Sequence, residues 1–210
     1  MATGSIGTYL STNLTLDALQ GNHIGESQHD DPGDEYNDTG LTMVNTEFES
    51  GVIFGETDSA SNKFGLIYSY GFNNNLDYHQ KFAGSTGKMV AKVSSIESSR
   101  LGISASHFIH SNHLHFEVGL TGKALWPLGN SDQLPVATSL PGEEITIEFQ
   151  DQAASWRIVA EMGEWVDLPD QLRLHARLFV GMGSSGSKTV RHAISTVGLT
   201  LEAQKMFSKD

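Results

Sequence analysis

One short run of the sequence combines residue types that could bind a metal ion. Residues 113 to 118 read HLHFEV, so two histidines stand two positions apart, ahead of a phenylalanine and a glutamate. If the run is a strand, His113 and His115 project to the same side, because successive side chains of a strand point to opposite faces. One imidazole could then bind zinc while the other orients a bound water.

The run resembles the signature strand of the lysostaphin-type (LytM-like) zinc endopeptidases. In that family a His-x-His pair is followed by Phe-Glu and then by Gly-Lys and Pro-Leu. Here Gly-Lys stands at 122 to 123 and Pro-Leu at 127 to 128. The partial resemblance covers residues 51 to 128, and it implies a zinc hydrolase that cuts the peptide cross-bridges of cell walls.

The resemblance also implies roles for individual residues. His115 would bind the zinc, and His113 and His79 would be the catalytic histidines. The family's upstream His-x-x-x-Asp element, which supplies two further ligands, is not found in this chain, and the nearest substitutes are His29 and Asp34. A catalytic zinc usually has three protein ligands, so these two residues would have to complete the site.

A second group of possible ligands is acidic. Residues 29 to 38 read HDDPGDEYND, and carboxylates gathered around a Pro-Gly turn are oxygen ligands of the kind that Ca²⁺ prefers. An acidic loop that only keeps a protein soluble has the same composition. The candidate calcium ligands are Asp30, Asp31, Asp34, Glu35 and Asp38.

The simpler interpretation of HLHFEV is a strand without a metal. Its apolar residues would pack on a core while the two histidines and Glu117 face water or a lumen. No cofactor and no catalytic residue is then required, and we favour this interpretation over the enzyme.

The strand interpretation extends along the whole chain, because apolar residues occupy every second position in one stretch after another. In residues 172 to 182 the apolar positions alternate with Arg173, His175 and Arg177. No stretch shows a sustained period of 3.6 residues. We therefore predict an all-β protein, an antiparallel meander of about nine to eleven strands with little helix. The same period of two occurs at 6–18, 64–72, 114–120, 156–162 and 197–203.

Turn residues predict how these strands connect. Short polar turns at 73–75, 110–113 and 168–171 predict hairpins of antiparallel strands, whereas 21–38 and 127–144 are longer polar connections. No change of composition marks a linker, so residues 1 to 210 are predicted to form a single β-domain.

Composition restricts the partners. The net charge is -12 and there is no cysteine, so we expect neither nucleic-acid binding nor disulfides. The first residues lack a basic stretch followed by an apolar run, so we expect no signal peptide in this chain. No run of about 18 apolar residues is present, which excludes a membrane-spanning helix but not a spanning barrel.

Alternation alone leaves two folds open, a closed barrel and a two-sheet sandwich. In a membrane barrel the apolar side chains would face lipid, and Arg173, His175, Arg177 and Glu117 would line a polar lumen. In a soluble sandwich the same charged side chains would meet water.

The sequence thus predicts a non-enzymatic protein of the cell envelope or the extracellular space. It would be either an outer-membrane-barrel-like protein or a structural subunit of an assembly, with membrane lipid or further copies of itself as partners and a homo-oligomer as one outcome. The charged strand faces would select solutes or contact partner subunits. The alternative is the cell-wall zinc endopeptidase, or a degenerate relative without catalysis.

Overall fold

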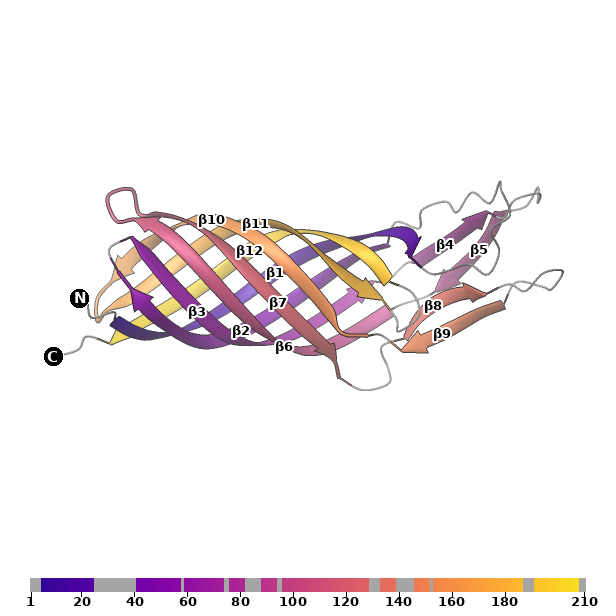
Figure 1. Cartoon of the computed structure of the whole chain (residues 1–210), viewed down its shortest axis with the longest axis horizontal. Coiled ribbons are helices and arrows are strands. Elements are labelled where there is room, and N and C mark those ends of the chain that lie inside the picture. Colours follow the sequence, from indigo (N-terminus) through magenta and orange to yellow (C-terminus); the bar gives the residue numbers. More distant parts are fainter. Residues whose placement is uncertain are drawn as a thin grey trace.

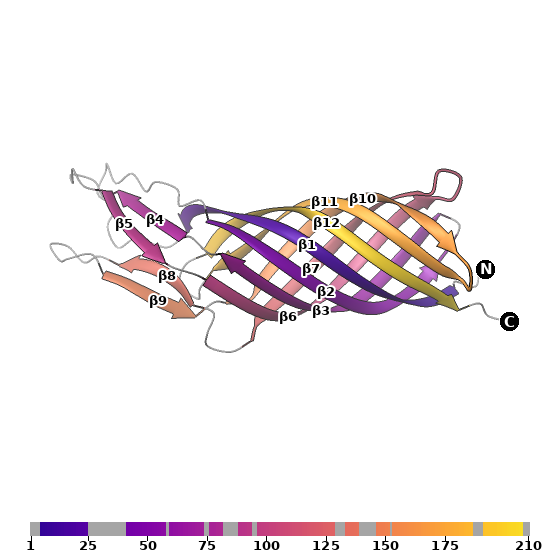
Figure 2. The ribbon, with the colours of Figure 1, turned by 180° about the vertical axis from the view of Figure 1, so that it is seen from behind.

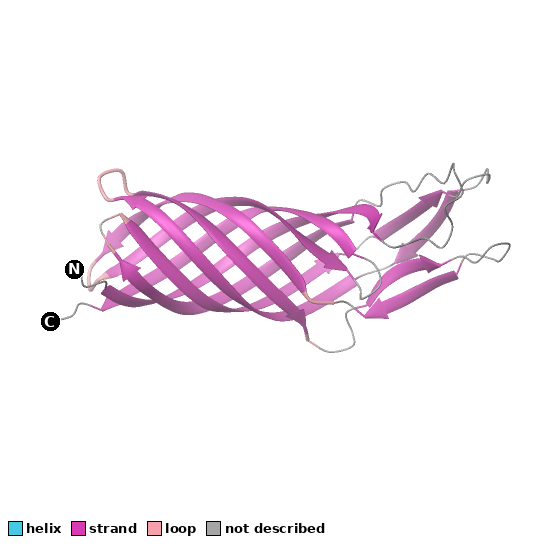
Figure 3. Cartoon of the chain, in the orientation of Figure 1, coloured by secondary structure: helices cyan, strands magenta, loops and turns pink. Residues whose placement is uncertain are grey.

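The chain is built of strands. In the part that the computed structural model describes there are twelve β-strands and no helix (Figure 3), which confirms the all-β prediction. The described residues are 5–24, 41–57, 59–73, 76–81, 88–93, 96–128, 133–138, 146–151, 153–186 and 191–207.

None of these residues belongs to a helix that could span a lipid bilayer.

Eight strands form a closed antiparallel barrel (Figure 1). Their order around the ring is β1-β12-β11-β10-β7-β6-β3-β2, and β1 pairs with both β12 and β2, which leaves no free edge. The barrel is therefore the correct choice between the two folds, and the sandwich is excluded. The barrel strands are β1 (Ser5–Ile24), β2 (Leu41–Glu56), β3 (Ala60–Asn73), β6 (Ile96–Ser111), β7 (Phe116–Pro127), β10 (Ser155–Leu168), β11 (Leu172–Gly186) and β12 (Arg191–Phe207).

Four shorter strands pair outside the barrel wall. β4 (Leu76–Lys81) pairs with β5 (Lys88–Val93), and β8 (Gln133–Thr138) pairs with β9 (Thr146–Asp151). The predicted hairpin at 73–75 is wrong, because β3 pairs with β6 and the chain leaves the barrel between them. The predicted loop 127–144 contains β8.

The two ends of the barrel differ. β1 begins and β12 ends at one end, and the two small sheets lie beyond the other (Figure 2). We call the first the turn end, because β2 ends and β3 begins there, and the turns 112–115 and 169–171 join β6 to β7 and β10 to β11 there. The other is the loop end. The hairpins predicted near 110–113 and 168–171 are confirmed as β6-β7 and β10-β11.

The two faces of the wall are unlike. On β11, Leu178 and Val180 point outward and are 64% and 61% exposed, while His175 and Arg177 are buried at 4% and 2%. The same alternation of exposed and buried positions runs along the other barrel strands. The predicted period of two is confirmed, with the apolar face outside.

The interior combines large side chains with glycines. Gly119 on β7 pairs with Phe108 on β6, and Phe108 is buried. A Cβ atom added at Gly119 would overlap the ring carbons of Phe108. Gly122, on the same strand, faces outward, and the nearest atom to an added Cβ is 4.0 Å away.

These two glycines give a matched test of the two faces. We expect Gly119→Ala to lower the free energy of unfolding by about 1–3 kcal/mol, because overpacking displaces a buried ring. Gly122→Ala should change it by less than about 0.5 kcal/mol, as surface substitutions usually do. Urea unfolding followed by tryptophan fluorescence measures both. Equal effects at the two positions would contradict the assignment of the faces.

Candidate functional site inside the barrel

The interior of the barrel is charged. Among the described residues, six carboxylates and five cationic side chains are buried there. Buried charges are costly unless they are paired and hydrogen-bonded, so their arrangement decides whether the lumen is open or filled. They are Asp17, Glu47, Glu49, Glu117, Glu161 and Glu202, with Lys63, Arg100, Lys123, Arg157 and Arg177.

One group of ion pairs, which we call the Arg157 cluster, lies nearer the loop end and consists of Asp17, Glu47, Lys123 and Arg157. Arg157 Nη2 is 2.5 Å from Asp17 Oδ2, and its Nη1 is 2.6 Å from Glu47 Oε1. Lys123 Nζ lies 2.7 Å from Glu47 Oε2. β10 and β2 are four strands apart in the ring of eight, so the pair between Arg157 and Glu47 crosses the lumen from wall to wall.

A second group, the Arg177 cluster, lies nearer the turn end. Arg177 bridges three carboxylates from three strands: Nη1 is 2.8 Å from Glu117, Nη2 is 2.6 Å from Glu202, and Nε is 3.1 Å from Glu161. Lys63 reaches Glu202 from β3 at 2.6 Å. The cluster therefore joins the wall formed by β7, β10, β11 and β12 to β3 on the far side.

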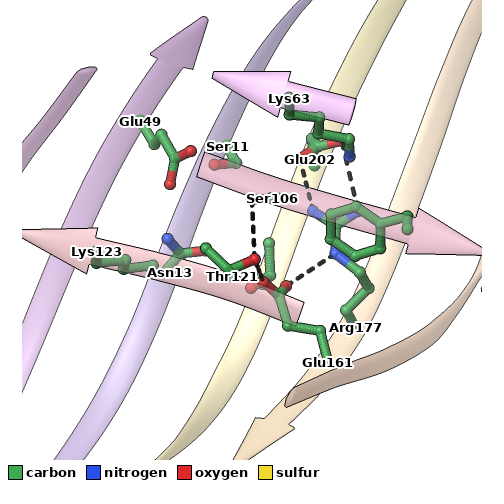
Figure 4. A pocket seen from close by; sticks show the side chains of 12 residues that line it. Ser11, Asn13, Glu49, Lys63, Ser106, Thr121, Lys123, Glu161, Arg177 and Glu202 are labelled. Atoms are coloured by element: carbon green, nitrogen blue, oxygen red, sulfur yellow. Dashed lines mark hydrogen bonds and ion pairs between the residues drawn. The ribbon is translucent and has the colours of Figure 1, made fainter. Parts of the chain in front are cut away.

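The space left between the two clusters is small. A cavity of about 10 Å³ is lined by Asn13, Thr121, Thr200 and members of both clusters (Figure 4). That is about the volume that one water molecule needs. Eight strands enclose an interior that side chains can just fill, and the buried side chains of the two clusters surround this cavity.

At the turn end, a buried aromatic side chain lies among three histidines and an arginine. Trp165 is 5% exposed, and its ring lies 5.8 Å from that of His110, 5.6 Å from His115 and 5.9 Å from His175. Arg173 places its guanidinium carbon 5.1 Å from the same ring. The indole and these four side chains form a group at the turn end beside the Arg177 cluster, to which His175 connects through Glu117.

The structure corrects the geometry expected for HLHFEV. His113, Leu114 and His115 lie in the turn 112–115, and β7 begins only at Phe116. His115 has a positive φ of 50°, and Leu114 is 73% exposed. The two histidines therefore do not share a strand face, and Leu114 does not pack on a core. These residues form a turn and not a strand because the chain must reverse direction here for β6 to pair with β7.

The other predicted site residues fall into three places. Glu117, His175 and Arg177 face the interior, where His175 Nδ1 lies 2.6 Å from Glu117 Oε1. Arg173 is at the turn end and pairs with Asp167 at 2.6 Å. In the described residues no group of three His, Asp or Glu side chains could hold a metal. His79 lies in β4, whose backbone alone is described, and His29, Asp30, Asp31, Asp34, Glu35 and Asp38 lie outside the described residues.

Several residues of the network were missed by the sequence analysis. Their signal is present, because each occupies the polar position of an alternating stretch, as Arg157 does between Trp156 and Ile158. What alternation does not show is which charges meet across a ring. The missed residues are Asp17, Glu47, Lys63, Lys123, Arg157, Glu161 and Glu202.

Comparisons with known proteins give only distant likenesses. No family model matches the chain, and no curated protein matches its sequence. Similar solved structures include Neisserial surface protein A, with 10% identity and a TM-score of 0.48 over 95% of this chain and 97% of that one. The outer membrane protein AlkL in lipid bilayers has 11% identity and a TM-score of 0.42 over 97% and 90%. The outer membrane protein OprG of Pseudomonas aeruginosa has 8% identity and a TM-score of 0.45, over 97% of this chain and 97% of that one. At these identities and TM-scores the likenesses carry no information about what this chain does.

Proposed function

We propose that this chain is an integral β-barrel of an outer membrane, without enzymatic activity, whose interior is closed in the conformation described. It would anchor its loop end, with the two small sheets, at the cell surface. The observation that carries the proposal is the continuous apolar outer face of a closed barrel. A ring without edges satisfies the backbone hydrogen bonds internally, which is the requirement for crossing lipid.

The outer face has the distribution of charge that lipid requires. Among the outward side chains that the structure describes, charges occur at Glu164 of β10 and Lys205 of β12, both close to the turn end. Exposed apolar side chains cover all eight strands between the two ends. Soluble monomers rarely expose an apolar patch of more than about 300–600 Å², so a belt around the whole wall favours lipid as its surroundings.

Aromatic side chains support the same orientation. Tyr70, Trp126 and Trp156 point outward close to the loop end of their strands, and Phe54 and Phe207 do so at the turn end. Aromatic girdles of this kind mark the two interfaces of transmembrane barrels. Short turns on one side and longer loops on the other complete the pattern.

The ion-pair clusters favour an anchor over an open pore. Pairs that cross the lumen, such as Arg157 with Glu47 at 2.6 Å, leave a cavity for about one water between the clusters. A permanently open channel needs a continuous aqueous path, which larger barrels provide.

Tryptophan fluorescence tests whether the outer face meets lipid. Trp126 and Trp156 point outward at 47% and 48% exposure, whereas Trp165 is inside at 5%. In single-tryptophan variants, made by Trp→Phe changes and refolded into vesicles with brominated acyl chains, we expect strong quenching of Trp126 and Trp156 and little of Trp165. The reason is that only outward rings of a spanning barrel contact lipid.

The three variants control one another, since they differ only in which indole remains. Equal, weak quenching of all three would show that the barrel does not lie in the bilayer and would overturn the proposal. A chain that stays folded and monodisperse without detergent would count against it in the same way.

A further inference from the structure

Arg157 crosses the lumen to Glu47, whereas Arg177 bridges carboxylates of neighbouring strands on one side of it, and the two arginines share a further feature. Every carboxylate that these arginines bridge has a second donor already in contact. In the Arg177 cluster, Glu202 keeps Lys63 at 2.6 Å, Glu117 keeps His175 at 2.6 Å, and Glu161 accepts a hydrogen bond from Thr121.

The Arg157 cluster has the same redundancy. Glu47 keeps Lys123 at 2.7 Å, and Asp17 accepts a hydrogen bond from Asn45 Nδ2 at 2.7 Å. A buried carboxylate is strongly destabilising when its partner is removed and nothing replaces it. Glu47 and Glu202 would each keep a lysine, and the other three carboxylates would each keep a hydrogen-bond donor, so either guanidinium could move away without leaving any of these carboxylates wholly unpartnered.

The polar lining also lacks an explanation in stability alone. Replacing buried ion pairs by well-packed apolar side chains is often neutral or stabilising, and an anchor could be filled with leucines. Instead, polar and charged side chains extend along the axis from Asp17 and Arg157, past the cavity bordered by Thr121 and Thr200, to the Arg177 cluster.

We propose that the barrel carries a latent ion path along its axis, which Arg157 and Arg177 close as two gates in series, with the cavity between them as an intermediate site. The path conducts when both guanidinium groups turn away from the axis and water enters. This rests on the proposed position of the barrel in a membrane.

The charges inside predict the selectivity. Six carboxylates and five cationic side chains are buried among the described residues. With both gating arginines replaced by neutral side chains, the cationic side chains that remain buried with these six carboxylates in the described part of the chain are Lys63, Arg100 and Lys123. A lumen with an excess of carboxylates favours cations.

Bilayer recordings of the full chain test the proposal. We expect the double variant Arg157→Gln/Arg177→Gln to open at least tenfold more often than the native chain in KCl, with a reversal potential in a salt gradient on the cation side. Each single variant should fall between the two. Lys205→Gln is the matched control, because Lys205 is a cationic side chain that points outward near the turn end and belongs to neither cluster.

A thiol at the cavity gives a second measurement that needs only one gate to be removed. The chain has no cysteine, and Thr200 is 4% exposed and lines the cavity. In Thr200→Cys, we expect a charged, membrane-impermeant methanethiosulfonate to react at least tenfold faster when either arginine is also changed to Gln. This measurement tests the gated path even if the double variant does not refold.

The outcomes separate the two proposals. Quenching by brominated lipid, together with native-like conductance of the arginine variants and no reaction of the thiol introduced by Thr200→Cys, would overturn the gated path and leave the membrane anchor intact. Loss of lipid quenching in the native chain would overturn the anchor. Conductance without cation preference would refute the claim that the carboxylates make the path selective for cations.

Discussion

Glu202→Gln is expected to lower the free energy of unfolding by about 3–5 kcal/mol, the usual cost of removing one partner of a buried ion pair. Among the carboxylates that the structure describes, Glu202 pairs with Lys63 at 2.6 Å, and it also binds Arg177. Lys63 is 3% exposed, and its Nζ lies 4.4 Å from the centroid of the Phe108 ring. The change therefore leaves an ammonium group buried against an aromatic ring without its counter-charge. Urea unfolding of the refolded protein in lipid, followed by fluorescence, measures the loss.

The matched control is Asp167→Asn at the turn end. Asp167 pairs with Arg173 at 2.6 Å, but its side chain is 53% exposed. Exposed pairs contribute about 0–1 kcal/mol, so this variant should unfold almost as the native chain does. If the two losses were equal and small, water would have to reach Glu202, and the closed interior would be wrong.

The fold class could be predicted from the sequence because each strand has two unlike sides. On β11 this is direct: Leu174, Leu178 and Val180 are exposed on the outside, whereas His175 and Arg177 are buried inside. Alternation does not show what the apolar face contacts, however, because such a face packs equally well on a second sheet or on lipid. Only the pairing of β1 with β12 closes the ring, and that pairing joins strands from opposite ends of the chain.

Local patterns failed where tertiary pairing overrode them. HLHFEV continues the alternation, yet three of its residues form the β6-β7 turn. The polar turn after Phe72 suggested a hairpin, yet β3 pairs with β6 across an excursion of more than twenty residues. In both cases the register of the barrel fixes where a strand must end, and a short window of sequence does not contain that register.

The candidate site was even less accessible to prediction. Alternation identified His175, Arg177 and Glu117 as side chains of one polar face. Their partners come from other walls: Arg177 meets Glu202 of the next strand, and Arg157 meets Glu47 from across the ring. Such contacts depend on strand order, shear and tilt together, and no spacing along the chain encodes them.

Arginine substitutions on the outer face of β11 should depend steeply on depth. Val180 lies in the middle of the strand and Leu174 two residues from its start at the turn end, and both point outward at 61% and 40% exposure. We expect Val180→Arg to cost about 2–4 kcal/mol and Leu174→Arg about 0–1 kcal/mol, because an arginine is most costly at the bilayer midplane and can reach water near an interface. Urea unfolding in phospholipid vesicles measures both.

The pair discriminates between lipid and water because the two variants carry the same new side chain on the same face of the same strand. In a water-soluble barrel, both would change the free energy of unfolding by less than about 0.5 kcal/mol, as exposed substitutions usually do. A difference of several kcal/mol between them can arise only if the surroundings change from apolar to aqueous along β11. The apolar outer face would then be a lipid-facing surface, and the charges inside would be the part of the protein that is left to interact with water and ions.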